Sequence, residues 1–310
     1  MGTPVFVDGA AGTTGLEIVA RLEAHPEFEP LVLDEASRKD AEARREALND
    51  TPFAVLCLPD DAARDAVAMI DPASPTRIVD ASTAHRVADG WTYGFPEIIG
   101  RERIAEASRV SNPGCYPTGF LGLVAPLVRA GLVPADWPYT VNAVSGYSGG
   151  GKALIERFER DTDIAFRTYG LALDHKHRPE MQRYAGLTHE VLFAPSVVPA
   201  FRGMVVDVPL HLGAMADGPS ADALRDELMR FYSDSPLITV ETGGDPGELM
   251  LGRNAAPLDD MVLHVFGNAD GWNARLIAVL DNLGKGASGA AIQNLNLMAG
   301  FAETASLKQR

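Results

Sequence analysis

The sequence predicts an α/β protein with a doubly wound, parallel N-terminal sheet and a second domain of the α+β type. Short apolar runs alternate with helix-like segments over the first hundred residues. This alternation favours parallel strands joined by right-handed helical crossovers. Farther along, several strand-like runs follow one another with few helices between them. Such a succession favours a mixed or antiparallel sheet with its helices on one face.

Apolar spacing places the individual elements. In the N-terminal part, strands are expected at 4–8, 31–33, 54–58 and 77–80, and helices at 16–23, 39–49 and 60–69, the last capped by Asp60. The 54–58 run is apolar throughout, as a sheet covered on both faces requires. In the rest of the chain, helices are expected at 116–130, 221–232 and 287 to about 307, and strands at 139–143, 190–195, 204–212, 238–242, 261–268 and 274–280. Pro126 is expected to kink or split the first of these helices.

Composition narrows the classes of function. The chain has 310 residues, enough for two domains, and a net charge of −15, which argues against nucleic acid as a partner. Two cysteines provide no disulfide framework, so a reducing cytoplasm is the expected compartment. We expect no membrane association, because no apolar run approaches the ~18 residues of a membrane span. The chain also opens directly as a strand rather than as a signal peptide.

A glycine-rich turn follows the first expected strand. Gly9, Gly12 and Gly15 are spaced as G-x-x-G-x-x-G, with Thr13 and Thr14 between the last two. A diphosphate needs backbone N–H groups brought close at a helix N-terminus, and side chains there would block it. The pattern departs from the common G-x-G-x-x-G, so a flexible turn is the alternative interpretation. In this strand–turn–helix context we interpret it as dinucleotide-binding.

The choice between NAD and NADP depends on the end of the second expected strand. Asp34 could accept from a ribose 2′-hydroxyl, which favours NAD. Ser37, Arg38 and Lys39 follow at once and could hold a 2′-phosphate, which favours NADP. We favour NADP(H), because Asp34 is expected simply to end the strand, while Arg38 and Lys39 are adjacent cations in an acidic chain. A solvated helix start is the alternative for this pair.

Cys115 is the strongest candidate for a nucleophile. It precedes Pro117, which suits the first turn of a helix because its missing N–H is not needed there. A cysteine at a helix N-terminus faces free N–H groups and the positive end of the dipole, which favour the reactive thiolate. The alternative is a small buried cysteine without reactivity.

Two further segments carry polar side chains of the kinds that active sites use. His175 and His177 lie before Pro179, which biases Arg178 away from helix, so we expect an extended segment with both imidazoles on one face. General acid–base chemistry is the favoured role, with a solvated basic loop or metal ligation as alternatives. No metal site is expected, because further ligands with recognisable spacing are missing. The stretch 145–152 is too glycine-rich for a regular element, and we interpret it as a close-approach loop rather than a linker.

The segments described above, taken together, resemble the shorter form of the N-acetyl-gamma-glutamyl-phosphate reductase family of arginine biosynthesis. The resemblance is carried, in chain order, by residues 9–15, 80–86, 91–97, 111–119 (Ser-Asn-Pro-Gly-Cys-Tyr-Pro-Thr-Gly), 145–152, 175–181 and 282–287. It covers nearly the whole chain. The wider group includes aspartate-semialdehyde dehydrogenase, which shares the fold and the cysteine chemistry.

The resemblance implies an activity and a set of catalytic residues. The family reduces an acyl phosphate to an aldehyde with NADPH through a thioester, which would form on Cys115 here. A histidine of the His175–His177 pair would move protons, and we favour His177. A thioester divides one difficult step into two easier ones and holds the carbon for hydride transfer.

The same resemblance implies a binding set and a domain arrangement. Substrate contacts are expected from Arg86, Ser145, Ser148, Gly149 and Lys152, and a cofactor contact from Asn282. The last helix would return to the first domain, so residues 1–114 and 285–310 would bind NADP, and 115–284 would hold the catalytic and oligomerisation functions. A homodimer or homotetramer is expected.

Other functions stay open from the sequence. A related acyl-phosphate reductase could act on N-acetyl-aminoadipyl or aspartyl phosphate, because a methylene is worth only ~1–3 kcal/mol of discrimination in an apolar site. A non-catalytic NADP-binding sensor could keep the same fold. A cysteine next to a histidine pair and a glycine-rich substrate loop favours the enzyme.

Overall fold

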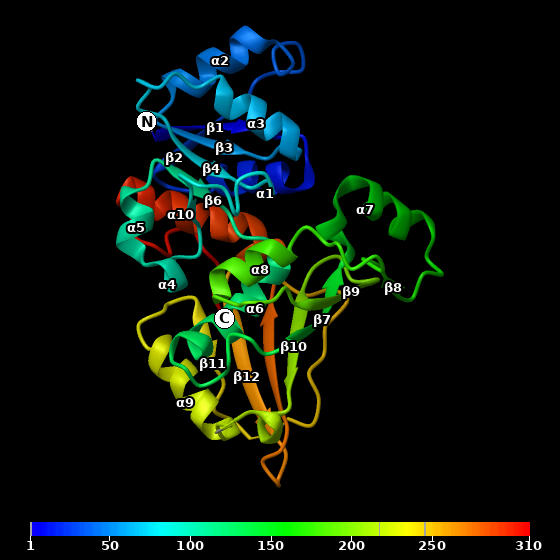
Figure 1. Ribbon diagram of the computed structural model, residues 1–310. Helices are drawn as coiled ribbons and strands as arrows, with labels where there is room; N and C mark the ends of the chain where they lie inside the picture. Colours follow the sequence, from blue (N-terminus) through cyan, green and yellow to red (C-terminus); the bar gives the residue numbers. More distant parts are fainter. Residues whose placement is uncertain (1, 217, 245) are drawn as a thin grey trace. The chain divides into compact units, whose positions relative to one another are not determined.

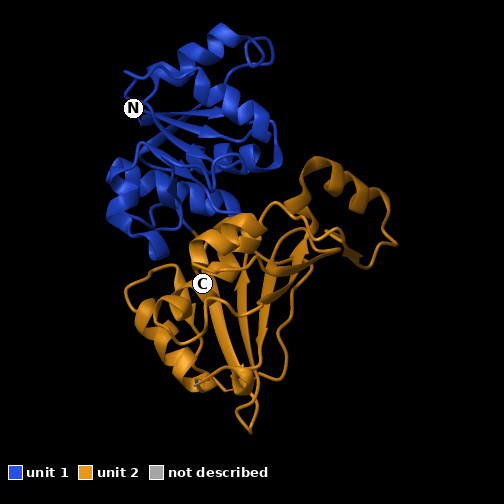
Figure 2. Cartoon of the chain, in the orientation of Figure 1, with its two compact units in different colours: residues 1–114, 287–307 blue, residues 115–286, 308–310 orange. Residues whose placement is uncertain are grey.

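The computed structural model describes residues 2–216, 218–244 and 246–310, and the chain divides into two compact units (Figure 2). Unit 1 consists of residues 1–114 and 287–307, and unit 2 of residues 115–286 and 308–310. Each unit has its own sheet. The two are described separately below.

Unit 1 is an alternation of strands and helices. Its elements are β1 (Thr3–Asp8), α1 (Thr13–Glu23), β2 (Phe28–Leu31), α2 (Ala41–Asp50), β3 (Phe53–Leu56), α3 (Asp60–Ala68), β4 (Arg77–Asp80), β5 (Thr92–Tyr93), α4 (Pro96–Ile99), α5 (Arg101–Glu106), β6 (Arg109–Ser111) and α10 (Gly289–Ala299). The sheet order is β2-β1-β3-β4-β6-β5, and the pairs between these neighbours are all parallel. The predicted doubly wound, Rossmann-type sheet is confirmed.

Apolar side chains cover both faces of this sheet. One core cluster joins β1, β3 and β4 to α1, α5 and α10, with Ile18, Ile104 and Ile292 among its buried members. The other joins the opposite face of the same strands to α2 and α3 through Leu48 and Ala66. Helix α10 thus packs on the first sheet, as the fold-class prediction required (Figure 1).

Unit 2 is a mixed sheet with helices. Its elements are α6 (Cys115–Arg129), β7 (Thr140–Gly146), the 3₁₀ turn η1 (Tyr147–Gly150), α7 (Gly151–Arg160), β8 (Arg167–Thr168), α8 (Arg178–Ala185), β9 (Leu192–Val198), β10 (Met204–Leu210), η2 (Leu212–Ala214), α9 (Ala221–Phe231), β11 (Ile238–Val240), β12 (Met261–Gly267) and β13 (Ala274–Leu280). The π-turn η3 (Gly284–Ser288) leads from unit 2 into unit 1.

The sheet of unit 2 has the order β11-β12-β13-β10-β7-β9-β8 and contains parallel and antiparallel pairs, so the predicted mixed sheet is confirmed. Helix α6 packs against it through glycines. A Cβ on Gly119 would lie 2.6 Å from Val206, and one on Gly122 would lie 2.5 Å from Met261. These two positions must therefore be glycine for α6 to lie at this depth.

Helix α6 is continuous, contrary to the expected interruption at Pro126. A proline inside a helix leaves the carbonyl four residues earlier without its N–H donor. Here that carbonyl belongs to Gly122, and the Tyr232 hydroxyl donates to it at 2.8 Å. A side chain from another element replaces the missing bond, which the local sequence does not reveal.

Three other local predictions were wrong. The second strand is 28–31, not 31–33, because pairing with β1 begins at Phe28, whereas Leu31 and Val32 are exposed. Asp60 is the first residue of α3 rather than its N-cap, and its carboxylate accepts instead from the N–H of Thr83. The last helix ends at Ala299, where Gly300 adopts the left-handed conformation that terminates helices.

The segments around the predicted site also differ from expectation. Residues 145–152 are not a loop: Ser145 and Gly146 end β7, and the rest forms η1 and the start of α7. Arg178 begins α8 instead of being extended. Pro179 occupies the first turn of that helix, where no N–H is needed, so it favours the helix start rather than preventing it. Elements β5, β6, α4, α5, α7 and β8 were not predicted.

Candidate active site

Cys115 is the first residue of α6, as predicted, and it is partly exposed. The turn that carries Gly286 lies directly against it. A Cβ on Gly286 would lie 2.8 Å from the Cβ of Cys115 and 3.1 Å from the carbonyl oxygen of Asp281. The helix N-terminus directs backbone N–H groups and the positive end of the dipole toward this position, which stabilises a thiolate.

An aromatic and histidine cluster surrounds the residue that follows the cysteine. The ring centroid of Tyr116 lies 6.3 Å from that of His175 and 5.8 Å from that of His177. The two imidazoles are 4.8 Å apart. The Tyr169 hydroxyl donates to the Tyr116 hydroxyl at 3.2 Å. The structure thus brings both predicted histidines to the side chain next to Cys115.

Burial keeps the two phenols and His175 of this cluster uncharged near neutral pH. It raises the pKa of Tyr116 well above its ordinary value, with a further increase from the neighbouring Tyr169 and Cys115. Burial also raises the pKa of Tyr169 to about 12. Burial, and then the charge of Lys176, lower the pKa of His175 to about 4, so this ring is neutral near pH 7. Both phenols remain hydrogen-bond donors.

His177 has an acidic neighbour that sequence reasoning did not single out. It caps α8, and its Nε2 lies 3.9 Å from a carboxylate oxygen of Glu180, one turn farther along the helix. Both side chains are buried. A carboxylate at this distance balances the positive charge that an imidazole acquires on taking a proton. The helical start of α8 creates this pair, because residues three apart lie on the same helix face.

The predicted substrate loop converges on Asn282. The Asn282 side chain donates to the Ser148 hydroxyl at 2.9 Å and accepts from the N–H of Gly203 at 2.9 Å. A Cβ on Gly149 would lie 3.4 Å from Asn282 and 3.6 Å from the Ser145 hydroxyl. Asn282 therefore holds η1 in place, and whether it also contacts the cofactor stays a prediction. Ser145 also contacts the Tyr116 phenol and lowers its pKa in part, which joins this group to the cluster.

Lys152 differs from the other predicted residues of the segment, because its side chain is exposed. It lies on the exposed side of the first turn of α7.

A buried ion pair supports the turn under the nucleophile. Arg202 donates to the Asp281 carboxylate at 2.9 Å, and the same carboxylate accepts from the N–H of Leu283 at 2.9 Å. The Asp281 carbonyl accepts from the N–H of Gly286 at 3.0 Å. Removing one partner of a buried pair leaves an uncompensated charge, so the turn depends on both side chains being present. In the sequence, the only indication of this ion pair is the acidic residue Asp281 directly before Asn282.

Within unit 1, the glycine turn leaves the N-terminus of α1 without a side-chain cap. Gly9 has φ +86°, and a Cβ there would lie 2.4 Å from the carbonyl oxygen of Cys57. Gly12 is the N-cap of α1 and supplies no side chain to its free N–H groups. The Thr13 hydroxyl oxygen is buried and has no hydrogen-bond partner among the described residues. An uncapped helix N-terminus with an unused hydroxyl matches an anionic phosphate ligand.

The residues expected to select the cofactor lie between β2 and α2. The Asp34 carboxylate accepts from the Ser37 N–H at 2.8 Å, and this bond lowers its pKa. Arg38 forms an exposed ion pair with Glu35, and Lys39 is exposed. Asp34 therefore closes a turn three residues beyond the strand, rather than ending the strand as expected.

A pair that was not predicted occupies the end of β1. Arg44 of α2 contacts the buried Asp8 carboxylate at 2.7 Å, directly before Gly9. The pair balances the negative charge that Asp8 would otherwise place beside the glycine turn.

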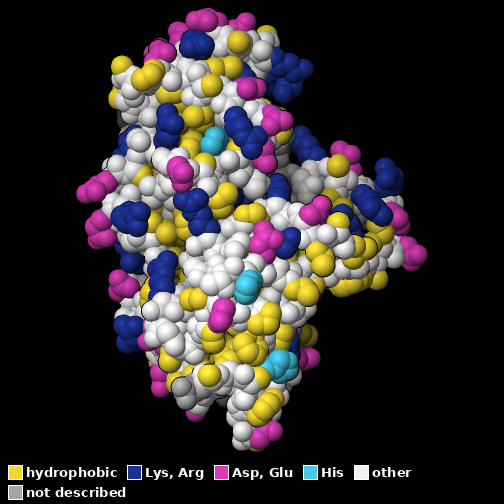
Figure 3. All heavy atoms as spheres, in the orientation of Figure 1, with side chains coloured by type: hydrophobic (Ala, Val, Ile, Leu, Met, Phe, Trp, Pro, Cys, Tyr) yellow, Lys and Arg dark blue, Asp and Glu magenta, His cyan; other side chains and the backbone are white. Residues whose placement is uncertain are grey.

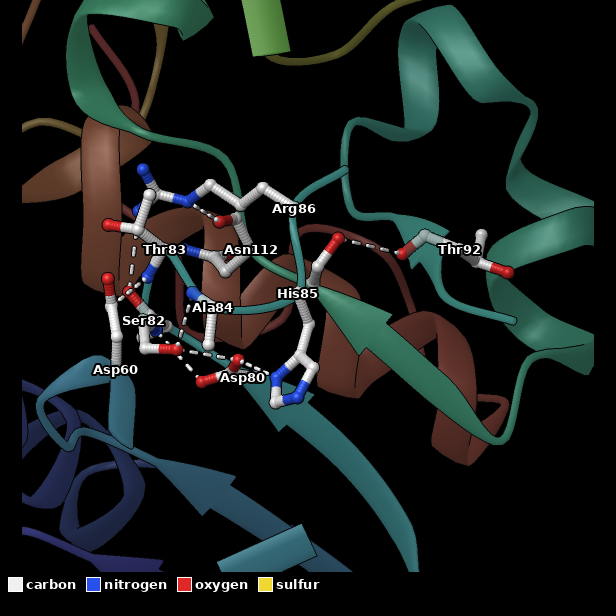
Figure 4. A network of polar contacts seen from close by, with 11 residues as sticks. Asp60, Asp80, Ser82, Thr83, Ala84, His85, Arg86, Thr92 and Asn112 are labelled. Atoms are coloured by element: carbon white, nitrogen blue, oxygen red, sulfur yellow. Dashed lines mark hydrogen bonds and ion pairs between the residues drawn. The ribbon is translucent and has the colours of Figure 1, made fainter. Parts of the chain in front are cut away.

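A polar network also lies at the end of β4 (Figure 4). Asp80 accepts from the Ser82 hydroxyl at 2.7 Å and contacts Nδ1 of His85 at 2.6 Å, and the His85 ring stacks on Trp91. Arg86 is buried, and its Nε donates to the Asn112 carbonyl at 3.0 Å. Its predicted contact with substrate stays a prediction, and its observed contacts hold the segment that leads to Cys115.

Asn112 in turn joins two distant segments of unit 1. Its side chain donates to the carbonyl of Ala287 at 2.9 Å and accepts from Asn294 of α10 at 3.1 Å. The two points at which the chain leaves and re-enters unit 1 are therefore bonded to one another.

The surface charges, the helix lengths and the arrangement of potential metal ligands bear on the other roles considered from the sequence. On the face shown in Figure 3, acidic and basic side chains are interspersed rather than separated by sign. Every helix in the described part of the chain is too short or too polar to cross a membrane. Within residues 2–216, 218–244 and 246–310, no group of three or more His, Cys, Asp or Glu is arranged to hold a metal ion.

Comparison with known proteins defines first a class and then a family. Residues 4–107 match the family model for the semialdehyde dehydrogenase NAD binding domain, and residues 115–282 match that for the semialdehyde dehydrogenase dimerisation domain. The chain is 45% identical to N-acetyl-gamma-glutamyl-phosphate reductase 2 of Nostoc sp., covering 98% of each chain, and 45% identical to N-acetyl-gamma-glutamyl-phosphate reductase of Brucella ovis, covering 97% and 100%. The chain belongs to the N-acetyl-gamma-glutamyl-phosphate reductase family, as the sequence motifs predicted.

Solved structures share the fold at lower identity. Aspartate semialdehyde dehydrogenase II of Vibrio cholerae superimposes with a TM-score of 0.71 at 19% identity, covering 97% of this chain and 99% of that one. The enzyme of Candida albicans, solved with NADP, gives 0.69 at 15% identity, covering 96% and 99%. These similarities confirm the predicted fold class.

Proposed function

We propose that this protein reduces N-acetyl-gamma-glutamyl phosphate to N-acetyl-glutamate 5-semialdehyde and phosphate with NADPH, as a step of arginine biosynthesis. The position of Cys115 at the N-terminus of α6, next to a cluster with two histidines, carries the proposal. Relatives at 45% identity over nearly full length bear the name of this activity and support the choice of substrate.

The chemistry begins at the sulfur of Cys115. Its thiolate attacks the acyl carbon, the bond from that carbon to the phosphate oxygen breaks, and phosphate leaves with the electron pair, so that a thioester remains. When bound, NADPH supplies a hydride ion to the thioester carbon. The oxygen on that carbon then takes a proton from a histidine. Finally the carbon–sulfur bond breaks, the hydroxyl proton returns to the histidine, and the aldehyde leaves as the thiolate is restored.

His177 is the favoured proton carrier in this scheme. The carboxylate of Glu180, 3.9 Å away, would stabilise the imidazolium form that donates the proton. His175 has a pKa lowered to about 4, so it would remain neutral throughout. It would position His177, whose backbone N–H donates to Nδ1 of His175 at 3.3 Å.

NADP rather than NAD is the proposed cofactor. The Asp34 carboxylate is already used by the Ser37 N–H, which weakens its case as a partner for a ribose 2′-hydroxyl. Ser37, Arg38 and Lys39 remain as candidates for a 2′-phosphate. The ion pair of Arg38 with Glu35 is exposed, and exposed pairs are weak enough to exchange for a phosphate.

The two units would divide the work. Unit 1 would bind the dinucleotide through Gly9, Gly12, Thr13, Thr14 and Gly15, and unit 2 would hold the substrate and form a homodimer or homotetramer. The match of residues 115–282 to a dimerisation domain supports the second role. Two cysteines kept as thiols suit a reducing cytoplasm.

A substrate panel crossed with both cofactors tests the proposal. The semialdehydes of N-acetyl-glutamate, N-acetyl-aminoadipate and aspartate are oxidised in the presence of phosphate with NADP or NAD, and the reduced cofactor is followed at its absorbance band. We expect the highest kcat/KM for N-acetyl-glutamate semialdehyde with NADP. Cys115→Ser should reduce the rate by at least ~10⁴-fold while circular dichroism stays unchanged. Turnover that survives this substitution would contradict the mechanism.

A further inference from the structure

Arg167 carries a positive charge into the surroundings of the tyrosine cluster. It lies in β8, the edge strand of the second sheet, where it pairs with Val197 of β9. Its guanidinium carbon lies 4.5 Å from the ring centroid of Tyr169. A guanidinium stacked on an aromatic ring is held in orientation while its N–H groups remain directed outward from the stack.

Tyr169 connects this cation to the nucleophile. Its hydroxyl donates to the Tyr116 hydroxyl at 3.2 Å, and Tyr116 directly follows Cys115. Both charged groups affect the phenol: after burial, the Cys115 side chain raises the pKa of Tyr169, while Arg167 lowers it. Arg167 and Cys115 therefore lie near one and the same side chain.

Arg167 also differs from two other arginines of unit 2, whose positive charges are paired with carboxylates. Arg178 pairs with Glu190, and Arg202 pairs with Asp281. Arg167 forms no ion pair with a carboxylate of the described residues, and its guanidinium instead makes a cation–π contact with the ring of Tyr169. A planar group with five donors, held on an aromatic ring of the cluster and not paired with a carboxylate of the described residues, is suited to bind a carboxylate or phosphate of a ligand in bidentate fashion.

We propose that Arg167 binds the α-carboxylate of the acyl-phosphate substrate and thereby selects substrates that carry one. This inference rests on the proposed function. The phosphate is bonded to the carbon that Cys115 attacks, so it must lie beside the sulfur. Arg167 lies over the face of Tyr169, one aromatic ring farther out than the hydroxyl that meets Tyr116. The α-carboxylate, which a short aliphatic chain separates from the acyl carbon, meets a cation at that position.

The reverse reaction tests the assignment, because there the aldehyde and phosphate are separate substrates with separate KM values. We expect Arg167→Gln to raise the KM for N-acetyl-glutamate semialdehyde by about 30-fold, as the loss of a charge-assisted bidentate contact implies. The KM for phosphate should not change, and kcat should stay within ~3-fold. Arg167→Lys keeps the charge without the bidentate geometry, so its KM for the aldehyde should lie between those of the unsubstituted protein and Arg167→Gln.

Two comparisons sharpen the result. Arg160→Gln removes the same charge from the exposed end of α7 and should leave all constants unchanged. The α-carboxamide analogue of the semialdehyde should show a KM about 30-fold higher than the carboxylate with the unsubstituted protein, and no further rise with Arg167→Gln.

Each other outcome overturns the inference in a distinct way. A rise in the KM for phosphate instead of the aldehyde would make Arg167 a phosphate ligand. A fall in kcat with both KM values unchanged would make it a support for Tyr169. If Arg167→Gln does not fold, Arg167→Lys gives the same test, since a KM for the aldehyde equal to that of the unsubstituted protein contradicts the contact. Absence of turnover by the unsubstituted protein would instead remove the proposed function itself, and the inference with it.

Discussion

The glycine turn of unit 1 and the cysteine site of unit 2 differ in how far apart in the sequence their contacting residues lie. The turn is local: Gly12 donates to the Gly9 carbonyl at 3.1 Å, and Leu16 donates to that of Gly12 at 2.9 Å. The cysteine site gathers side chains from distant positions. The partners of Tyr116 come from four stretches of the chain, and include Ser145, Tyr169, His175, His177 and Ser196.

The two cysteines of the protein also lie in different environments. Cys57 directly follows β3 and lies under the glycine turn, where its carbonyl is 2.4 Å from the Cβ that Gly9 lacks. Although the residue is only partly buried, burial of its thiol, with the Asp80 and Asp8 carboxylates, raises its pKa to about 12. Cys115 instead starts a helix. The comparison teaches that burial beside two carboxylates makes the Cys57 thiol unreactive, whereas a helix start and a polar cluster favour reactivity of the Cys115 thiol.

Alkylation gives the largest expected difference between the two regions. With a pKa of about 12, roughly 10⁻⁴ of Cys57 is thiolate near pH 8, so iodoacetamide should not label it in the folded protein. Cys115 should be labelled at least ~10³-fold faster, with loss of activity in parallel. Peptide mass spectrometry after timed quenching measures both rates.

The control for this experiment is the unfolded chain. In urea both cysteines should react at similar rates, because the environments that distinguish them are gone. Comparable labelling of Cys57 in the folded protein would show that the turn of unit 1 does not protect its thiol.

Substitutions in the glycine turn should separate folding from ligand binding. Gly9→Ala forces a side chain into a left-handed conformation and against the Cys57 carbonyl, so we expect a loss of about 2–4 kcal/mol of unfolding free energy. Gly12→Ala meets its nearest atom at 3.5 Å, so it should change stability by at most about 1 kcal/mol. If α1 receives the diphosphate, Gly12→Ala should still weaken NADPH binding by about tenfold.

Urea unfolding and NADPH fluorescence titration measure the two effects. The interpretation of the turn as a phosphate site would be wrong if Gly12→Ala bound NADPH as well as the unsubstituted protein does. Equal stability of the Gly9→Ala and Gly12→Ala proteins would contradict the local packing argument.

The smallest expected effect concerns His175 and pH. Its pKa is about 4 in the folded protein and 6.5 ordinarily, so between these values the unfolded chain binds more protons. Stability therefore falls as the pH falls from about 6.5 to 4. His175→Asn should remove part of this decrease, about 1–2 kcal/mol after allowance for the partial exposure of the ring.

Urea unfolding at pH 7 and pH 4.5 measures the change. His25 and His264 also have lowered pKa values, but both proteins retain them, so only the difference between the two slopes matters. Identical slopes would show that the imidazole of His175 is as well solvated in the folded chain as in the unfolded one.

The sequence predicted the elements whose signals are local. Apolar runs marked β4 and β13 to the residue, and the turn at 9–15 was interpreted from its glycine spacing and its position between a strand and a helix. Two of the wrong predictions have a common cause, because each interpreted a local signal without the distant segment that pairs with it. Pro126 does not interrupt α6, because Tyr232, more than a hundred residues away, supplies the missing hydrogen bond. The start of β2 depends on pairing with β1, which Phe28 begins.

The same division holds for the candidate site. Cys115, His175 and His177 were chosen from residue type and motif, and the structure gathers them around Tyr116. Tyr169, Glu180 and Arg202 were missed, because a tyrosine or arginine in isolation has many structural uses. Glu180 could have been found, since an acid three residues after a histidine shares its helix face once α8 is known to begin at Arg178.

By itself, the sequence determined the fold class, strands such as β4 and β13, and the residue that starts α6, because backbone preferences and apolar spacing act over a few residues. Only the tertiary structure decided which side chains meet at Tyr116, that Arg167 stacks on Tyr169 without an ion pair to the described carboxylates, and that His175 is held neutral. Those properties depend on burial and on charges brought together across long stretches of chain, and no short-range pattern encodes either one.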